Sequence, residues 1–200
     1  MTTATGRPRG FDEQDALDRA LDIFWRNGYR ATTTRTLEEG LGLSQSSIYN
    51  AFESKRGLFE AALDRYEVMT TEVLVEPLET APDGLASVLR FFDALSDWVS
   101  HEGRGGCLII NLMAEDGGED GAITTRTRAY RSRVRAALLA ALRRAERQGE
   151  AAGASSVARA DVLFGQVLAI NLTARGGASP DEVAGLLDGV RQLVQSWVSD

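Results

Sequence analysis

TTRTLEEGLGLSQSSIYNAFESK, residues 33–55, contains two short helical segments separated by a glycine. Thr33 stands where a helix N-cap is expected, and the first predicted helix covers residues 35–41. Gly42 can adopt the left-handed conformation that ends a helix, and Ser44 is a second N-cap candidate, before a helix over residues 45–51. Two helices joined by a short turn with a glycine are typical of a helix-turn-helix, whose second helix enters the DNA major groove. The stretch therefore predicts a DNA-binding unit.

Composition is that of a globular protein from a reducing compartment. Hydrophobic residues make up 44% of the 200 residues, enough for one large domain or for a small domain attached to a larger one. Cys107 is the single cysteine, which excludes an intrachain disulfide. No run reaches the roughly 18 apolar residues that span a bilayer, and residues 1–10 form no apolar signal region. We therefore expect a cytoplasmic protein with no membrane partner.

Catalytic and metal chemistry have few candidate residues. His101 and Cys107 are the single histidine and cysteine, and no cluster has metal-ligand spacing. Acid–base chemistry by carboxylates alone remains a distant alternative, that of an all-helical enzyme. We expect no enzyme activity, no cofactor and no metal site.

The net charge of −7 is unevenly distributed along the chain. Residues 1–66 contain nine Lys and Arg against ten Asp and Glu, so a DNA-binding surface there must be a local cluster. Residues 67–125 contain two against twelve, and residues 126–147 contain eight against one. The arginine-rich segment is either a nucleic-acid patch or a solvated helix face that neutralises the acidic region, and we favour the second interpretation. Arg7 and Arg9 similarly allow a solvated tail or a basic arm on DNA.

Apolar residues recur at helical spacing along nearly the whole chain, which predicts an all-α fold of about nine helices. A long helix from Lys55 should end before Pro77, because proline lacks a backbone N–H. Ser179 and Glu182 should form a capping box at the start of the last helix. The last two helices have apolar faces too large for solvent, which predicts that they pair with a second copy of the chain. The predicted helices cover residues 13–27, 35–41, 45–51, 55–75, 85–101, 107–114, 123–148, 156–174 and 180–197.

The N-terminal quarter of the chain resembles the tetracycline-repressor (TetR) family of bacterial one-component regulators. Residues with that family's spacing lie between residues 11 and 59, and they are Gly28, Tyr29, Thr32, Thr33, Leu37, Gly42, Ser44, Ile48, Tyr49, Phe52, Ser54 and Lys55. The resemblance implies an N-terminal three-helix helix-turn-helix domain, residues 1–54. It also implies a C-terminal helical domain, residues 55–200, that binds a ligand and dimerises.

The resemblance also assigns roles at the DNA end of the chain. Thr33 would bind a phosphate, Arg35 a guanine edge or a phosphate, and Gln45 an adenine edge. The remaining candidates are Ser46 and Ser47, which let the helix approach closely, Tyr49 and Lys55, which bind phosphates, and Asn50, which binds a base or a phosphate. A core aromatic and a surface lysine are the alternatives for Tyr49 and Lys55, and Leu37, Ile48 and Phe52 are assigned to the core. Glu38, Glu39, Gly40 and Ala51 depart from the family's pattern, which suggests modest affinity or an unusual operator.

Seven residues of the larger domain are candidates for an apolar effector pocket, with core packing as the alternative for each. They are Phe92, Trp98, Cys107, Met113, Tyr130, Phe164 and Asn171. Tyr130 and Asn171 are favoured, because a buried polar group needs a partner. Cys107 is either an inert buried thiol or a sensor of electrophiles, activated by Arg104.

Together these features predict a ligand-responsive transcriptional regulator. We expect a repressor that binds a palindromic operator in double-stranded DNA as a homodimer and is released by an unidentified small molecule. A DNA-binding or activator protein without a sensing function is the alternative.

Overall fold

The computed structural model describes residues 11–100, 105–151 and 155–198, which belong to two compact units. The first unit ends at Arg65 and the second begins at Tyr66. The division falls within one helix, α4, Lys55–Thr70. Three features of the sequence prediction lie outside the described residues: the arm of residues 1–10, His101 and Arg104.

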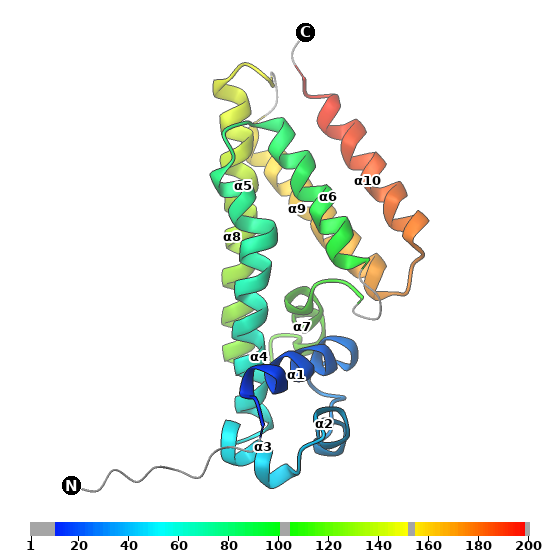
Figure 1. The fold of residues 1–200 in the computed structure, drawn as a ribbon. Helices are drawn as coiled ribbons and strands as arrows, with labels where there is room; N and C mark the ends of the chain where they lie inside the picture. The colour runs from blue at the N-terminus through cyan, green and yellow to red at the C-terminus, as the bar shows by residue number, and fades with distance from the viewer. Residues whose placement is uncertain (1–10, 101–104, 152–154, 199–200) are drawn as a thin grey trace, which may run out of the picture. The chain divides into compact units, whose positions relative to one another are not determined.

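The first unit contains α1 (Glu13–Asn27), α2 (Thr34–Leu41), α3 (Gln45–Phe52) and the first part of α4 (Figure 1). Its core is aromatic: the rings of Phe24 and Phe59 meet edge to face with centroids 5.1 Å apart. Arg65 binds Asp18 of α1, with Nη2 2.7 Å from Oδ2, and Gln14, with Nη1 2.9 Å from Oε1. These contacts fix α4 against α1.

The second unit continues α4 through η1 (Thr71–Val75) and α5 (Glu76–Thr80), and it adds α6 (Leu85–Val99), α7 (Leu108–Asp116), α8 (Gly121–Arg147), α9 (Ser156–Arg175) and α10 (Pro180–Gln195). Ser179 and Glu182 form the predicted capping box. With residues 55–80 counted as one helical run, the described part of the chain contains nine helices, which confirms the predicted all-α fold.

The prediction that the long helix ends before Pro77 is wrong, because the helical run continues to Thr80. Residues Thr71–Val75 form a π turn, in which the N–H of Glu76 donates to the carbonyl of Thr71. Pro77 lies in the first turn of α5. Backbone N–H groups in the first turn of a helix have no partner within that helix, so a proline there costs little. The wider turn thus allows the chain to pass a proline without ending the helix.

Arginines of α8 bind the run of helix from α4 to α5. Arg126 Nε is 2.9 Å from Glu67 Oε1, and Arg133 Nη2 is 2.9 Å from Glu79 Oε2. The Arg133 guanidinium lowers the pKa of the Glu79 carboxyl. Arg144 donates to the carbonyl of Leu78 at 2.7 Å. Two arginines of this segment thus neutralise carboxylates of the acidic region that precedes it, as the favoured interpretation expects.

Helix α9 is long and apolar enough to cross a bilayer by length and composition, with a mean hydropathy of 1.2 in its most apolar window. It packs instead against α8, α10, α6 and α7. Leu163, Val167 and Ile170 are buried in these contacts. In this fold α9 is therefore a partly buried core helix.

Candidate nucleic-acid interface

Both helices of the predicted helix-turn-helix are capped by hydrogen bonds between residues close in sequence. Thr33 Oγ1 accepts from the N–H of Thr36 at 3.1 Å, and Ser44 Oγ accepts from the N–H of Ser47 at 3.3 Å. Gly42 ends α2 in the left-handed conformation, with φ of 67°. Both predicted N-caps and the glycine C-cap are thus confirmed.

Two of the residues that depart from the family's pattern have structural roles in this unit. Glu38 Oε1 accepts from the backbone N–H of Gln45 at 2.7 Å, so its carboxylate closes the first turn of α3. A Cβ on Gly40 would lie 2.5 Å from Ile23 Cδ1, so glycine allows α2 to approach α1 closely. Glu38 therefore helps to position α3, and Gly40 lies where α2 packs on α1.

Helix α3 presents a polar face beside a buried one. Gln45, Ser46 and Asn50 are exposed, whereas Ile48 is fully buried. Ser46 and Ser47 hydroxyls lie 3.0 Å and 2.9 Å from that of Ser44, which keeps this end of the helix compact. Phe52, assigned to the core, is only half-buried. The exposed face offers amide groups that can donate to and accept from base edges.

Tyr49 is held by a residue that the sequence analysis missed. Its hydroxyl lies 3.2 Å from Thr34 Oγ1, and its ring is half-buried. The contact fixes a phenolic hydroxyl at the junction of α2 and α3, where it can reach a phosphate. In the sequence, only the side-chain hydroxyl of Thr34, next to the N-cap Thr33, indicates that it could bind Tyr49.

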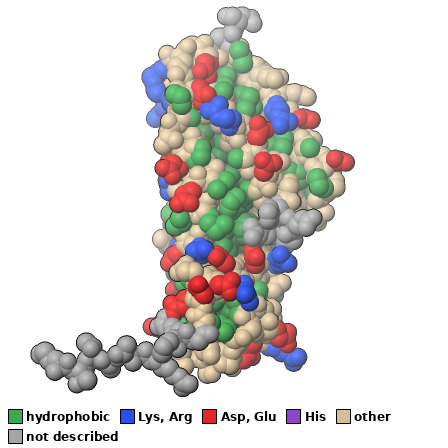
Figure 2. Space-filling view, viewed as in Figure 1, with side chains coloured by type: hydrophobic (Ala, Val, Ile, Leu, Met, Phe, Trp, Pro, Cys, Tyr) green, Lys and Arg blue, Asp and Glu red, His purple; other side chains and the backbone are tan. Residues whose placement is uncertain are grey.

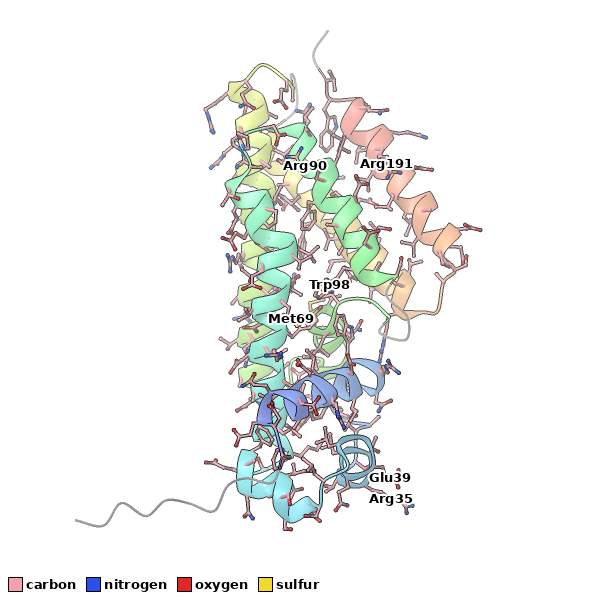
Figure 3. The ribbon with its side chains drawn as sticks, viewed as in Figure 1. Arg35, Glu39, Met69, Arg90, Trp98 and Arg191 are labelled. Atoms are coloured by element: carbon pink, nitrogen blue, oxygen red, sulfur yellow. The ribbon has the colours of Figure 1, made fainter. Side chains whose placement is uncertain are left out.

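Arg35 and Glu39 form an ion pair on α2, with Nε 2.8 Å from Oε1 (Figure 3). The two side chains are 86% and 65% exposed, so water screens the pair and its energy is small. Arg35 can leave Glu39 for a phosphate or a base at little cost, but the carboxylate stays beside the binding face. We therefore expect Glu39 to weaken DNA binding.

We expect Glu39→Gln to raise operator affinity by about 3- to 10-fold, because it removes one negative charge per protomer and releases Arg35. Fluorescence anisotropy with a labelled operator at two salt concentrations would measure the change, which should shrink at high salt. Asp15→Asn is the matched control, since it breaks the i,i+4 pair of Arg19 and Asp15 on α1. An equal gain in both variants would contradict the role given to Glu39.

Lys55 lies at the start of α4 over an aromatic ring. Its Nζ is 4.5 Å from the centroid of the Tyr29 ring, which in turn lies 4.5 Å from that of Phe59. Ser54 Oγ accepts from the N–H of Gly57, and a Cβ on Gly57 would lie 2.1 Å from the Phe52 carbonyl oxygen. The tight turn and the packed rings of Tyr29 and Phe59 together position the ammonium group of Lys55. The sequence analysis did not identify Tyr29 as the residue under this group.

Acidic side chains offset much of the positive charge in the described part of the first unit. Asp12 caps α1 by accepting from the N–H of Gln14 at 2.8 Å, and Asp15 and Asp18 of α1 pair with Arg19 and Arg65. In the space-filling view, acidic and basic side chains are interspersed, and no broad basic field covers the visible face (Figure 2). That DNA recognition depends on a few placed side chains, as the charge count indicates, stays a prediction.

Four of the predicted pocket residues lie in one polar cluster of the second unit. Tyr66 Oη accepts from Trp98 Nε1 at 3.2 Å and from the N–H of Leu108 at 3.0 Å. The N–H of Cys107 donates to Asn171 Oδ1 at 2.6 Å, and Cys107 Sγ lies 3.9 Å from Tyr130 Oη. Burial raises the pKa of the Cys107 thiol, and it raises the pKa values of the Tyr66 and Tyr130 hydroxyls well above their usual value. The cluster is thus neutral and internally hydrogen-bonded.

The other three predicted pocket residues are dispersed. Phe92 and Phe164 are buried in the helical core. Met113 lines a separate cavity of about 320 Å³ between α7 and α8, together with Asp116, Gly117, Gly118, Thr124, Thr127, Arg128 and Arg131. Of the seven residues, only Met113 lines this cavity, and contact of the seven with a ligand stays a prediction. Among the described residues no group of three or more His, Cys, Asp or Glu side chains is placed to hold a metal ion.

Two family models match the chain. Residues 16–62 match the model described as bacterial regulatory proteins, tetR family, and residues 84–190 match the tetracyclin repressor-like C-terminal domain. The helix-turn-helix and the helical unit after it are thus both of TetR type.

Curated relatives and solved structures agree with these matches. The chain is 29% identical over 181 residues to the HTH-type transcriptional repressor ComR of Escherichia coli, covering 89% of this chain and 86% of ComR. It is 30% identical over 106 residues to the HTH-type transcriptional repressor BdcR of the same organism, covering 52% of this chain and 54% of BdcR. A cysteine mutant of the TetR family regulator CifR, complexed with 26-bp double-strand operator DNA, matches with a TM-score of 0.81 and 26% identity. That match covers 96% of this chain and 100% of CifR.

The matched models include more than half of the chain, and the fold and the caps of α2 and α3 agree with them. The family consists of transcription regulators and is not enzymatic. The chain belongs to the TetR family of DNA-binding transcriptional regulators.

Proposed function

We propose that the chain is a cytoplasmic repressor that binds a palindromic operator as a homodimer and leaves it when a small-molecule effector binds the helical domain. The observation that carries the proposal is the exposed polar face of α3, where Gln45, Ser46 and Asn50 stand beside the anchored hydroxyl of Tyr49. ComR and BdcR are both repressors, and CifR binds operator DNA, which supports the same activity here.

Eight residues form the proposed DNA-binding surface. Thr33 and the N–H groups of the first turn of α2 would bind a phosphate, because helix N-termini favour anions. Gln45 and Asn50 would contact base edges. Arg35, Ser46, Ser47, Tyr49 and Lys55 complete the surface.

The proposed dimer forms through α9 and α10. Val162 and Leu172 are 47% and 48% exposed, large fractions for aliphatic side chains, and they lie on one stripe of α9. Gly165 lies between them, and a Cβ there would meet nothing within 4 Å. Gly185 and Gly189 give α10 a similar open surface. Small residues between apolar ones allow two helix pairs to approach closely in a symmetric four-helix interface.

Selection of genomic DNA fragments bound by the purified full chain would test the proposal. We expect palindromic sites whose half-sites are about one helical turn or more apart. A promoter overlapping such a site should give less transcript when the protein is added, and a metabolite screen should then find a compound that restores it. Absence of sequence-selective DNA binding at moderate salt would refute the proposal. An increase in transcript when the protein is added would show that it is an activator.

A further inference from the structure

The cavity between α7 and α8 differs in character from the apolar pocket expected for an effector. Met113 gives it one apolar wall, and the loop residues Gly117 and Gly118 expose backbone only. Arg128 and Arg131 line it from α8 and are both exposed to solvent. At about 320 Å³ the cavity is at the lower end of the range for small-molecule sites. It has room for a compact ligand with a charged group.

The polar groups on the inner wall of the cavity are already satisfied by the protein. Asp116 is buried; its Oδ1 accepts from the N–H of Asp120 at 3.0 Å and its Oδ2 accepts from the Thr124 hydroxyl at 3.2 Å. The Thr127 hydroxyl donates to the carbonyl of Thr124 at 3.1 Å. The single carboxylate of the lining is therefore engaged in holding the α7–α8 turn, which leaves the arginines to bind a ligand.

Arg128 and Arg131 differ from the other arginines of the first half of α8. Arg126, Arg133 and Arg135 each bind a carboxylate. Neither Arg128 nor Arg131 pairs with a carboxylate in the part of the chain that the structure describes. Residues three apart lie on the same face of a helix, and two like charges there repel each other unless an anion lies between them. The planar fork of each guanidinium matches a carboxylate or phosphate group.

We infer that this cavity is the effector site and that its ligand carries a carboxylate or phosphate group bound by Arg128 and Arg131, with a short apolar body against Met113. The inference rests on the proposed function, which requires an effector, and it names that effector's chemical class. The polar cluster around Cys107 is the weaker candidate, since Tyr66 Oη and Asn171 Oδ1 already accept hydrogen bonds from the protein.

The cavity is also linked through α8 to the part of α4 that belongs to the second unit. Arg126, two residues before Arg128, binds Glu67 of α4, the helix that begins at Lys55. A ligand that displaces the first turns of α8 would therefore act on α4 through this ion pair, and differential binding of this kind is what release from an operator requires.

Three probes with the same hexyl tail test the inference: heptanoate, hexyl phosphate and neutral hexan-1-ol. Binding to the full chain without DNA is measured by calorimetry and thermal unfolding at constant ionic strength. We expect both anions to bind and the alcohol not to bind, and the tighter anion identifies the head group. In the Arg128→Gln, Arg131→Gln double variant, affinity for the anions should fall by about tenfold or more.

The control is the Arg143→Gln, Arg147→Gln double variant, which removes the same charge from exposed positions of α8 outside the cavity. Circular dichroism shows whether each variant is folded. Equal binding of the three probes, or equal anion affinity in the two double variants, would overturn the inference. A separate operator-binding assay distinguishes it from the proposed function. If anions bind in an arginine-dependent way but do not release the protein from DNA, the anion site is upheld and ligand-controlled release is refuted. If the protein does not bind operator DNA at all, only the proposed repressor function is refuted.

Discussion

A Val162→Glu, Leu172→Glu double variant is expected to be a folded monomer that binds operator at least about 100-fold more weakly than the unchanged chain. In a two-fold symmetric interface each substitution occurs twice, so four carboxylates would be buried against one another or against apolar surface. Both positions are half-exposed in the single chain, so the substitutions leave its own core intact. Loss of the dimer removes the second half-site contact, which otherwise benefits from a high effective concentration.

Sedimentation velocity would measure the oligomeric state, and anisotropy with a labelled operator would measure affinity. Val68→Glu is the matched control, because Val68 of α4 is 56% exposed and lies outside α9 and α10. The control should sediment like the unchanged chain. A double variant that still sediments as a dimer would show that the two copies meet through another surface.

Gln45→Ala is expected to weaken binding to the operator by about 100-fold or more while leaving binding to a scrambled duplex unchanged. A bidentate contact to a base is worth about 1–3 kcal/mol, and the dimer makes it twice. Gln45 is exposed, and the Glu38 carboxylate binds its backbone N–H, so the substitution leaves α3 in place. The ratio of the two affinities is the measurement. An equal loss on both duplexes would assign Gln45 to the DNA backbone.

Lys55→Ala provides the comparison within the same surface. Loss of one phosphate contact per protomer should weaken binding to both duplexes and lower the slope of log affinity against log salt by about 2. Because the ammonium group lies over the Tyr29 ring, some packing is lost as well, and thermal unfolding separates that contribution. An unchanged salt slope would contradict a phosphate contact.

Much of the candidate interface could be predicted because its local structure depends on near neighbours in the chain. The hydrogen bonds of Thr33 with Thr36 and of Ser44 with Ser47 join residues three apart, and the left-handed Gly42 depends on its lack of a Cβ. Such contacts form wherever the residue types and spacing occur.

Residues with distant partners were interpreted less well. Glu38 and Gly40 suggested weakened DNA binding, but Glu38 binds the N–H of a residue on the next helix and Gly40 makes room for Ile23 of α1. Pro77 suggested a helix end, but a π turn allows the helical run to pass it. The prediction for Pro77 was wrong because the deciding carbonyl belongs to a neighbouring turn. The contacts of Glu38 and Gly40 could not be read from the sequence because their partners lie on other helices, and their effect on DNA affinity stays a prediction.

By itself the sequence determined the all-α fold, the helix-turn-helix with its caps, and the near-neutral net charge of the DNA-binding end. Composition and near-neighbour contacts suffice for all three. Only the tertiary structure decided which arginines of α8 are neutralised. Arg126 and Arg133 find Glu67 and Glu79 more than 50 residues away, whereas Arg128 and Arg131 line a cavity. Helix packing sets these distances, and one turn of a helix decides whether a guanidinium faces a carboxylate or an open site.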